Sequence, residues 1–107
     1  LMKVDRIANK DARKYVDRGE PFQGSNLFGE YDDLNEGSNT PYVVYSYGYH
    51  FPMFIYLNNL WYENSDKYSV STSKQQSQAR PTMKTIKLNT EEMLDLLKKN
   101  TLERINQ

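Results

Sequence analysis

The chain has 107 residues, carries equal numbers of acidic and basic side chains, and contains no cysteine. This length allows one modest hydrophobic core, so we expect a single domain over residues 1–107. The lack of cysteine excludes disulfides, thiolate metal sites and cysteine nucleophiles, and it fits a cytoplasmic protein. Because the apolar stretches are short, neither a signal peptide nor a membrane span is expected.

The charges are segregated along the chain. Between Gly19 and Asp66 there are acidic residues but no Lys or Arg, and from Lys67 to Thr90 there are basic residues but no Asp or Glu. The two blocks either pair with each other on the surface, or the basic block binds phosphates while the acidic block faces a partner protein's basic groove. The order of residues leaves both interpretations open.

A short amphipathic helix is predicted over Lys10 to Arg18. Asn9 is a suitable N-cap, and Gly19 and Pro21 are suited to end the helix. Apolar residues recur at helical spacing and predict one stripe packed on the core, made of Ala8, Ala12, Tyr15 and Val16.

The centre of the chain predicts a loop followed by three adjacent antiparallel strands. Asp32 to Pro41 is rich in turn-forming residues and is expected to be the longest loop. The aromatic and β-branched segments Tyr42–His50, Phe51–Leu57 and Leu60–Glu63 predict the strands, with a turn at 58–59.

Two further strands are predicted around an irregular segment. Lys67 to Ser71 is a candidate fourth strand, whereas Thr72 to Pro81 has no hydrophobic period and is expected to be a loop. In Lys84 to Leu88, Ile86 and Leu88 alternate with polar residues, a pattern typical of a half-buried strand.

The C-terminal segment has the charge pattern of a helix capped by Thr90. Glu91 and Glu92 fall in its first turn, where the helix dipole favours negative charge. The stripe expected to pack on the sheet consists of Met93, Leu94, Leu97 and Ile105, with Leu96 and Leu102 at its margins. The predicted class is α+β: a short N-terminal helix, an antiparallel sheet of four to five strands, and a C-terminal helix packed on one face.

Tyr45, Tyr47 and Tyr49 would project from the same face of an extended strand. Exposed rings in such a ladder could stack on the bases of single-stranded nucleic acid, with the neighbouring basic block holding its backbone. Aromatic pairs on a sheet are also ordinary core packing, and only the face that the C-terminal helix leaves uncovered could bind.

His50 is the sole histidine, so a histidine metal cluster is excluded and no metal or other cofactor is expected. As a general base His50 could act with Lys74 or Arg80 in a metal-free ribonuclease, although a packed structural role is the alternative.

The polar segment around Lys74 is rich in hydroxyl and amide side chains that suit contacts with phosphates or base edges. It equally suits a solvated loop, and no nucleophile or Gly-rich phosphate motif is present. The candidate residues for binding nucleic acid or a partner are Tyr45, Tyr47, Tyr49, Lys67, Lys74, Gln76, Arg80 and Lys84.

The runs at residues 42–52, 61–69 and 71–81 resemble a small domain found in phage and mobile-element proteins, a family that includes phage-encoded type II-A anti-CRISPR proteins. The resemblance implies action on guide RNA loading or guide RNA integrity. It also implies motif positions at His50, Lys74, Gln76 and Arg80. The family commonly carries a histidine where this chain has Gln75, which implies binding rather than catalysis here.

Three functional hypotheses follow. The first is an inhibitor that binds a CRISPR effector nuclease or its guide RNA in the cytoplasm of a bacterial host, through the basic segment or through the acidic block as a phosphate mimic. The second is a metal-free endoribonuclease that trims guide RNA. The third is a non-catalytic interaction module of a mobile element. The oligomeric state, including a homodimer, stays open.

Overall fold

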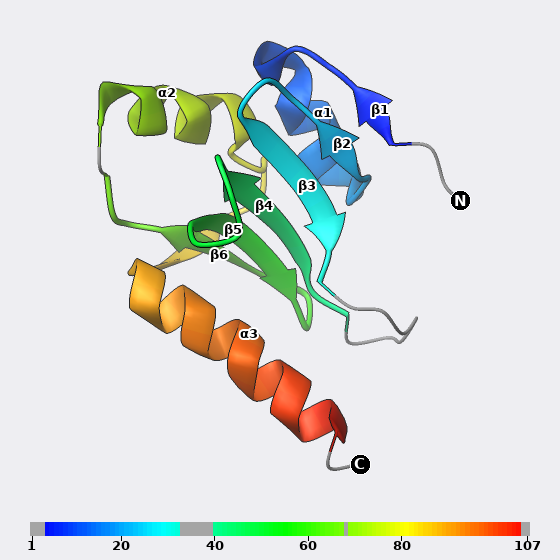
Figure 1. The fold of residues 1–107 in the computed structure, drawn as a ribbon, viewed down its shortest axis with the longest axis vertical. Coiled ribbons are helices and arrows are strands. Elements are labelled where there is room, and N and C mark those ends of the chain that lie inside the picture. Colours follow the sequence, from blue (N-terminus) through cyan, green and yellow to red (C-terminus); the bar gives the residue numbers. More distant parts are fainter. Residues whose placement is uncertain (1–3, 33–39, 68, 106–107) are drawn as a thin grey trace.

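The computed structural model describes residues 4–32, 40–67 and 69–105, which form an α+β fold with a seven-stranded mixed sheet (Figure 1). The strands are β1 (Asp5–Arg6), β2 (Phe22–Gln23), β3 (Leu27–Tyr31), β4 (Tyr42–Ser46), β5 (Pro52–Leu57), β6 (Leu60–Asn64) and β7 (Thr85–Leu88). The helices within the described residues are a 3-10 turn η1 (Asn9–Asp11), α1 (Ala12–Arg18), α2 (Val70–Ala79) and α3 (Thr90–Ile105).

The spatial order of the strands follows their order in the chain. Strands β2 to β6 are antiparallel, whereas β1 pairs with β2 and β7 pairs with β6 in parallel. The parallel β7 follows from α2, because a helical crossover returns the chain to the same end of the sheet. The expected antiparallel sheet of four to five strands is therefore corrected to a mixed sheet of seven, in which β1, β2 and β3 were not predicted.

Both faces of the sheet are covered by helices. Alternate residues of β4 serve opposite faces, with Tyr42 and Val44 in one core cluster and Val43 and Tyr45 in the other. The first cluster packs against α1 and α2, and the second against α3, which lies on the other side of the sheet (Figure 1). Burial on both faces explains why the strand sequence is apolar without a polar alternation.

Helix α2 overturns two predictions, the strand at Lys67–Ser71 and the loop at Thr72–Pro81. Its N-cap is Ser69, whose side chain accepts from the Thr72 backbone N–H. Its buried residues do have helical spacing, but they are almost all polar: Thr72, Gln75, Gln76 and Ala79. The one large apolar residue, Val70, points into solvent, so a search for hydrophobic periodicity misses this helix.

The N-terminal helix is confirmed, but its predicted cap is wrong. The Asn9 side chain makes no cap hydrogen bond, and the chain enters α1 through the 3-10 turn instead. Gly19 ends α1 with a left-handed φ of 63°, as expected for a glycine after a helix.

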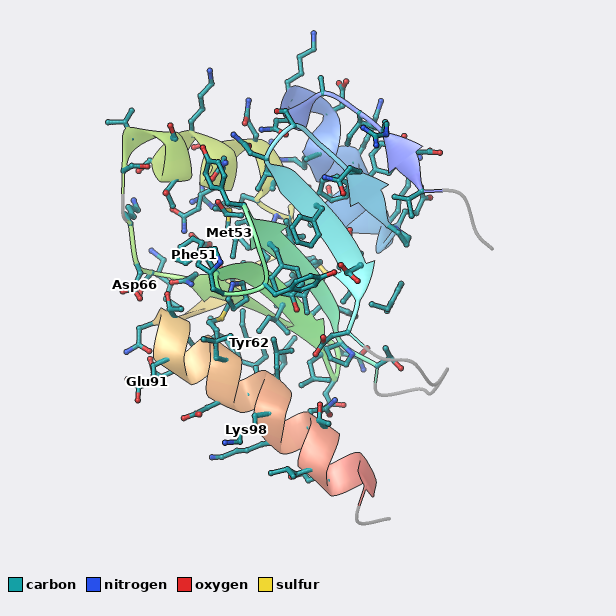
Figure 2. The ribbon with its side chains drawn as sticks, viewed as in Figure 1. Phe51, Met53, Tyr62, Asp66, Glu91 and Lys98 are labelled. Atoms are coloured by element: carbon teal, nitrogen blue, oxygen red, sulfur yellow. The ribbon has the colours of Figure 1, made fainter. Side chains whose placement is uncertain are left out.

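Helix α3 is capped one residue earlier than predicted. The Asn89 side chain accepts from the Glu92 N–H, and the Glu92 carboxylate accepts from the Asn89 N–H, so the two residues form a capping box. Asp66 lies beside the first turn of α3 and accepts from the Thr90 N–H (Figure 2). Hydrogen bonds from the backbone and the side chain of Thr90 lower the pKa of the Asp66 carboxyl.

The stripe of α3 that packs on the sheet is also shifted from the prediction. Met93 and Leu97 are buried and Leu96 packs beside them, whereas Leu94 is exposed. Ile105, the last member of the predicted stripe, lies outside the described side chains. Residues 33–39 of the predicted loop lie outside the described residues. Strand β7 is confirmed within its predicted range, although Ile86 is exposed because β7 is the edge strand.

Candidate functional site

The three tyrosines of the predicted ladder do not share one strand face. Strand β4 ends at Ser46, and Tyr47 adopts a left-handed φ of 66° that breaks the extended alternation. Tyr45 is buried in the α3-side core, whereas Tyr47 and Tyr49 are 64% and 62% exposed in the turn after β4. The ladder is therefore a wrong prediction, and of the three only Tyr47 and Tyr49 are accessible for binding.

Tyr49 folds back over the sheet. Its ring centroid lies 4.8 Å from that of Tyr45 and 5.3 Å from that of Phe28. Its hydroxyl donates a hydrogen bond of 2.6 Å to Glu30 Oε1, and this bond raises the pKa of Tyr49. The ring is thus held in place while most of its surface stays exposed.

Tyr47 is tied to the turn between β2 and β3. Its backbone N–H donates to the Asn26 carbonyl at 2.8 Å, and Asn26 Nδ2 lies 3.3 Å from the Tyr47 hydroxyl oxygen. Between Tyr47 and Tyr49 lies a hollow of about 310 Å³, which we call the aromatic hollow. Its lining residues are Gln23, Ser25, Asn26, Phe28, Glu30, Tyr47 and Tyr49.

Asn9 fixes the same turn from the N-terminal side. Its Nδ2 donates to Asn26 Oδ1 at 2.6 Å, and its Oδ1 accepts from the Ser25 N–H at 3.0 Å. Gly24 precedes these residues, and a Cβ there would collide with Asn9 Oδ1. The residue predicted as a helix cap therefore acts as a clamp on the β2–β3 turn.

A second hollow lies between this clamped turn and α2. It has a volume of about 440 Å³, and we call it the amide cavity. It is lined by Ser71, Lys74, Gln75 and Gln78 of α2 and by Ala8, Asn9, Lys10, Ser25 and Asn26 opposite. Among the described residues, the lining carries two lysines, several amides and hydroxyls, and no carboxylate.

A third hollow of about 430 Å³, the basic hollow, lies between α1 and α2. It is lined by Lys10, Asp11, Arg13, Lys14, Asp17, Ser77 and Gln78. Arg13 is already engaged, because its guanidinium donates to the carbonyls of Ser77 and Arg80 at 2.9 Å each. Asp17 is also engaged, as both its oxygens accept from Thr82.

The three hollows adjoin one another. The aromatic hollow and the amide cavity share Ser25 and Asn26, and the amide cavity and the basic hollow share Lys10 and Gln78. Exposed rings, amide donors and lysines thus follow one another along a single surface. This order of chemistry suits a flexible polyanion with flat groups, because rings can stack while cations hold the backbone.

Two of the predicted binding residues hold the fold together. Gln76 is buried, and its Nε2 donates to the Asn64 carbonyl. Arg80 pairs with Glu63, joining the acidic and basic blocks at this point. Lys67 and Lys84 are exposed, but neither lines any of the three hollows.

The proposed catalytic residues are separated. His50 is exposed in the turn before β5 and lines none of the three hollows, whereas Lys74 lines the amide cavity. Lys74 lies in the middle of α2, whereas Arg80 is the non-helical residue that follows the last turn of this helix. Arg80 directs its charge toward Glu63, so catalysis by His50 with Arg80 stays a prediction with no supporting contact.

The sequence-based prediction missed the N-terminal half of this surface. The candidate binding residues predicted from the sequence include neither Lys10 nor Lys14 nor Asn26. What brings them to the site is the Asn9–Asn26 contact, which joins residues 17 positions apart. No local pattern in the sequence indicates that contact.

Among the residues that the structure describes, no group of three histidine, aspartate or glutamate side chains could hold a metal ion. In the same part of the chain, no helix is both long and apolar enough to cross a membrane. Comparisons of this chain with protein-family models, curated proteins and solved structures found no match.

Proposed function

We propose that this chain is a phage-encoded inhibitor of a type II CRISPR effector nuclease, and that it acts by binding single-stranded guide RNA along the three hollows. The observation that carries this proposal is the continuity between the exposed rings of Tyr47 and Tyr49 and the cavity that holds Lys74. The CRISPR setting comes from the sequence resemblance, and the structure supports the RNA-binding part.

The chemistry of the surface matches single-stranded nucleic acid. A base stacked on an aromatic ring contributes about 1–3 kcal/mol, whatever its sequence. Lys10, Lys14 and Lys74 lie on the adjoining surface, and within the described residues none of them is within ion-pair distance of a carboxylate. Their charges are available for phosphates, and this binding will weaken as salt concentration rises.

The alternative, in which the acidic block mimics phosphates, has less support. Glu63 is buried and paired with Arg80, and Glu30 accepts a hydrogen bond from Tyr49. These carboxylates have partners within the chain. The basic side therefore offers the better-supported contact.

Gel-shift assays with guide RNA alone, with the effector alone, and with both test the proposal. We expect the chain to shift guide RNA and to reduce assembly of the effector–guide complex. The proposal is contradicted if the chain changes neither the mobility of guide RNA nor the amount of assembled effector–guide complex.

The same assay separates binding from cleavage. Guide RNA incubated with the chain in EDTA should remain intact if the chain only binds. Cleavage that disappears in His50→Ala would replace the binding proposal with the endoribonuclease. If the RNA stays intact and effector assembly is unchanged, the third hypothesis, a non-catalytic interaction module, is the one that remains.

A further inference from the structure

The amide of Gln75 has an unusual position on α2. The side chain is 2% exposed, and its Oε1 accepts from the Ser46 hydroxyl at 2.6 Å. Its Nε2 is buried and, within the described residues, has no hydrogen-bond partner. Buried donors are nearly always paired in native proteins, so this amide lacks a partner, and the only open space that its residue borders among the three hollows is the amide cavity.

The amide cavity that Gln75 lines differs in charge from its two neighbours. Lys74 and Lys10 line it, and none of the carboxylates that the structure describes does. The aromatic hollow contains Glu30, and the basic hollow contains Asp11 and Asp17. Judged by the residues that the structure describes, this cavity alone of the three combines cations and a buried unpaired donor with no carboxylate, and this combination favours an anion with acceptor oxygens.

The volume of the amide cavity, about 440 Å³, is far above the ~30 Å³ that one water occupies in the liquid. A phosphate group fits inside with part of its hydration shell. Ser71, in the first turn of α2, adds a hydroxyl on the same wall. The cavity also lies between the aromatic hollow and the basic hollow, where a nucleic-acid backbone would pass from stacked bases toward Lys14.

We infer that the amide cavity is a phosphate-binding subsite in which Lys74 and Lys10 neutralise the phosphate charge, while a small rotation of the Gln75 side chain exposes the buried Nε2 so that it donates to a phosphate oxygen. The inference deepens the proposed function and rests on it for the source of the phosphate, a phosphodiester of the RNA. Free inorganic phosphate shares this chemistry and serves as an independent probe.

The first test titrates inorganic phosphate into the ¹⁵N-labelled wild-type chain and follows side-chain amide signals by NMR. The Gln75 amide signals should shift and saturate, and chloride at matched ionic strength should not shift them. Gln76 provides an internal control, because its Nε2 is already bonded to the Asn64 carbonyl and should not respond. Gln75 signals that stay fixed throughout the phosphate titration overturn the subsite without requiring any variant to fold.

The second test measures the affinity for single-stranded RNA at several salt concentrations. Lys74→Ala should reduce the slope of log affinity against log salt by about 0.7, the value for one phosphate contact on a single strand. Gln75→Met should weaken binding about tenfold with an unchanged slope, because the lost donor is neutral. Lys98→Ala, at an exposed lysine of α3 on the other side of the sheet, should leave both quantities unchanged.

The two tests fail separately. If RNA binds and depends on Tyr47, yet Lys74→Ala and Gln75→Met bind like wild type, the subsite is wrong and the RNA-binding proposal stands. If phosphate shifts the Gln75 amide but RNA does not bind, the subsite stands and the proposed function falls.

Discussion

The guanidinium of Arg80 lies 3.0 Å from the carboxylate of Glu63, so the C-terminal end of α2 is fixed to β6. Thr85 of β7 donates a further hydrogen bond of 2.7 Å to the same carboxylate. Glu63 is only 5% exposed, and its charge is therefore compensated by groups from both neighbouring elements. The arginine that the sequence offered as a phosphate ligand holds two layers of the fold together.

Replacing Arg80 with methionine should destabilise the chain. The change keeps most of the apolar stem and removes the partner of a buried carboxylate, a loss worth about 1–3 kcal/mol. Urea unfolding followed by circular dichroism measures the free energy of unfolding. Lys84→Met, a change at an exposed lysine, should alter it by less than about 0.5 kcal/mol. The double variant Arg80→Met/Glu63→Gln should lose less free energy of unfolding than the two single variants lose together. A loss equal to the sum of the two single losses would contradict the pairing.

Stability should also fall in acid because of Glu63. Burial raises the pKa of this carboxyl. Hydrogen bonds from Arg80 and Thr85 lower the pKa by more than burial raises it, so the net shift is downward. A carboxyl with a lowered folded pKa contributes its full stability above its unfolded pKa of about 4.3 and loses it as the pH falls through the folded value. In Glu63→Gln the free energy of unfolding should therefore depend less on pH below about 4.3 than in wild type. An equal pH dependence in both proteins would show that Glu63 does not contribute.

The parts of the fold that follow from apolar patterns could be predicted from the sequence. The β5–β6 hairpin was predicted because Asn58 and Asn59 accept the left-handed backbone that a two-residue turn needs, and both have positive φ. Helix α3 was predicted because its acidic first turn and apolar residues agree on one direction. In these cases local preference and tertiary packing favour the same structure.

Helix α2 and half of the site could not be predicted, for two physical reasons. The buried face of α2 is mostly polar and is held by hydrogen bonds such as Ser46–Gln75, with Ala79 as its one apolar residue, so it carries little hydrophobic signal. The amide cavity depends on the contact between Asn9 and Asn26, which only the folded chain brings together. Lys74 and Tyr49 were identified because exposed charge and aromatic density are visible in the sequence itself.

The capping box at the start of α3 should contribute measurably to stability. Asn89→Ala removes the side-chain acceptor of the Glu92 N–H, and the loss of such a cap costs about 1 kcal/mol. A double-mutant cycle with Glu92→Ala, measured by urea unfolding, tests whether the two residues act together. Because each side chain bonds the other's backbone, the double variant should lose less than the sum of the single losses. Strictly additive losses would mean that the reciprocal arrangement does not form in solution.

The exposed rings should determine the affinity for RNA without affecting its salt dependence. Tyr47→Ala and Tyr49→Ala each remove one stacking surface, and at about 1–3 kcal/mol per base each should weaken single-stranded RNA binding at least about fivefold. Tyr31→Ala is a matched control, because that tyrosine is also exposed, at 46%, but it lines a hollow beside Trp61 and neither the aromatic hollow nor the amide cavity. Fluorescence anisotropy with a labelled oligonucleotide, repeated at two salt concentrations, gives affinity and slope together. Since stacking involves no counterion release, the slope should match that of wild type in all three variants. If Tyr31→Ala weakens binding as much as Tyr47→Ala, the RNA does not follow the aromatic hollow.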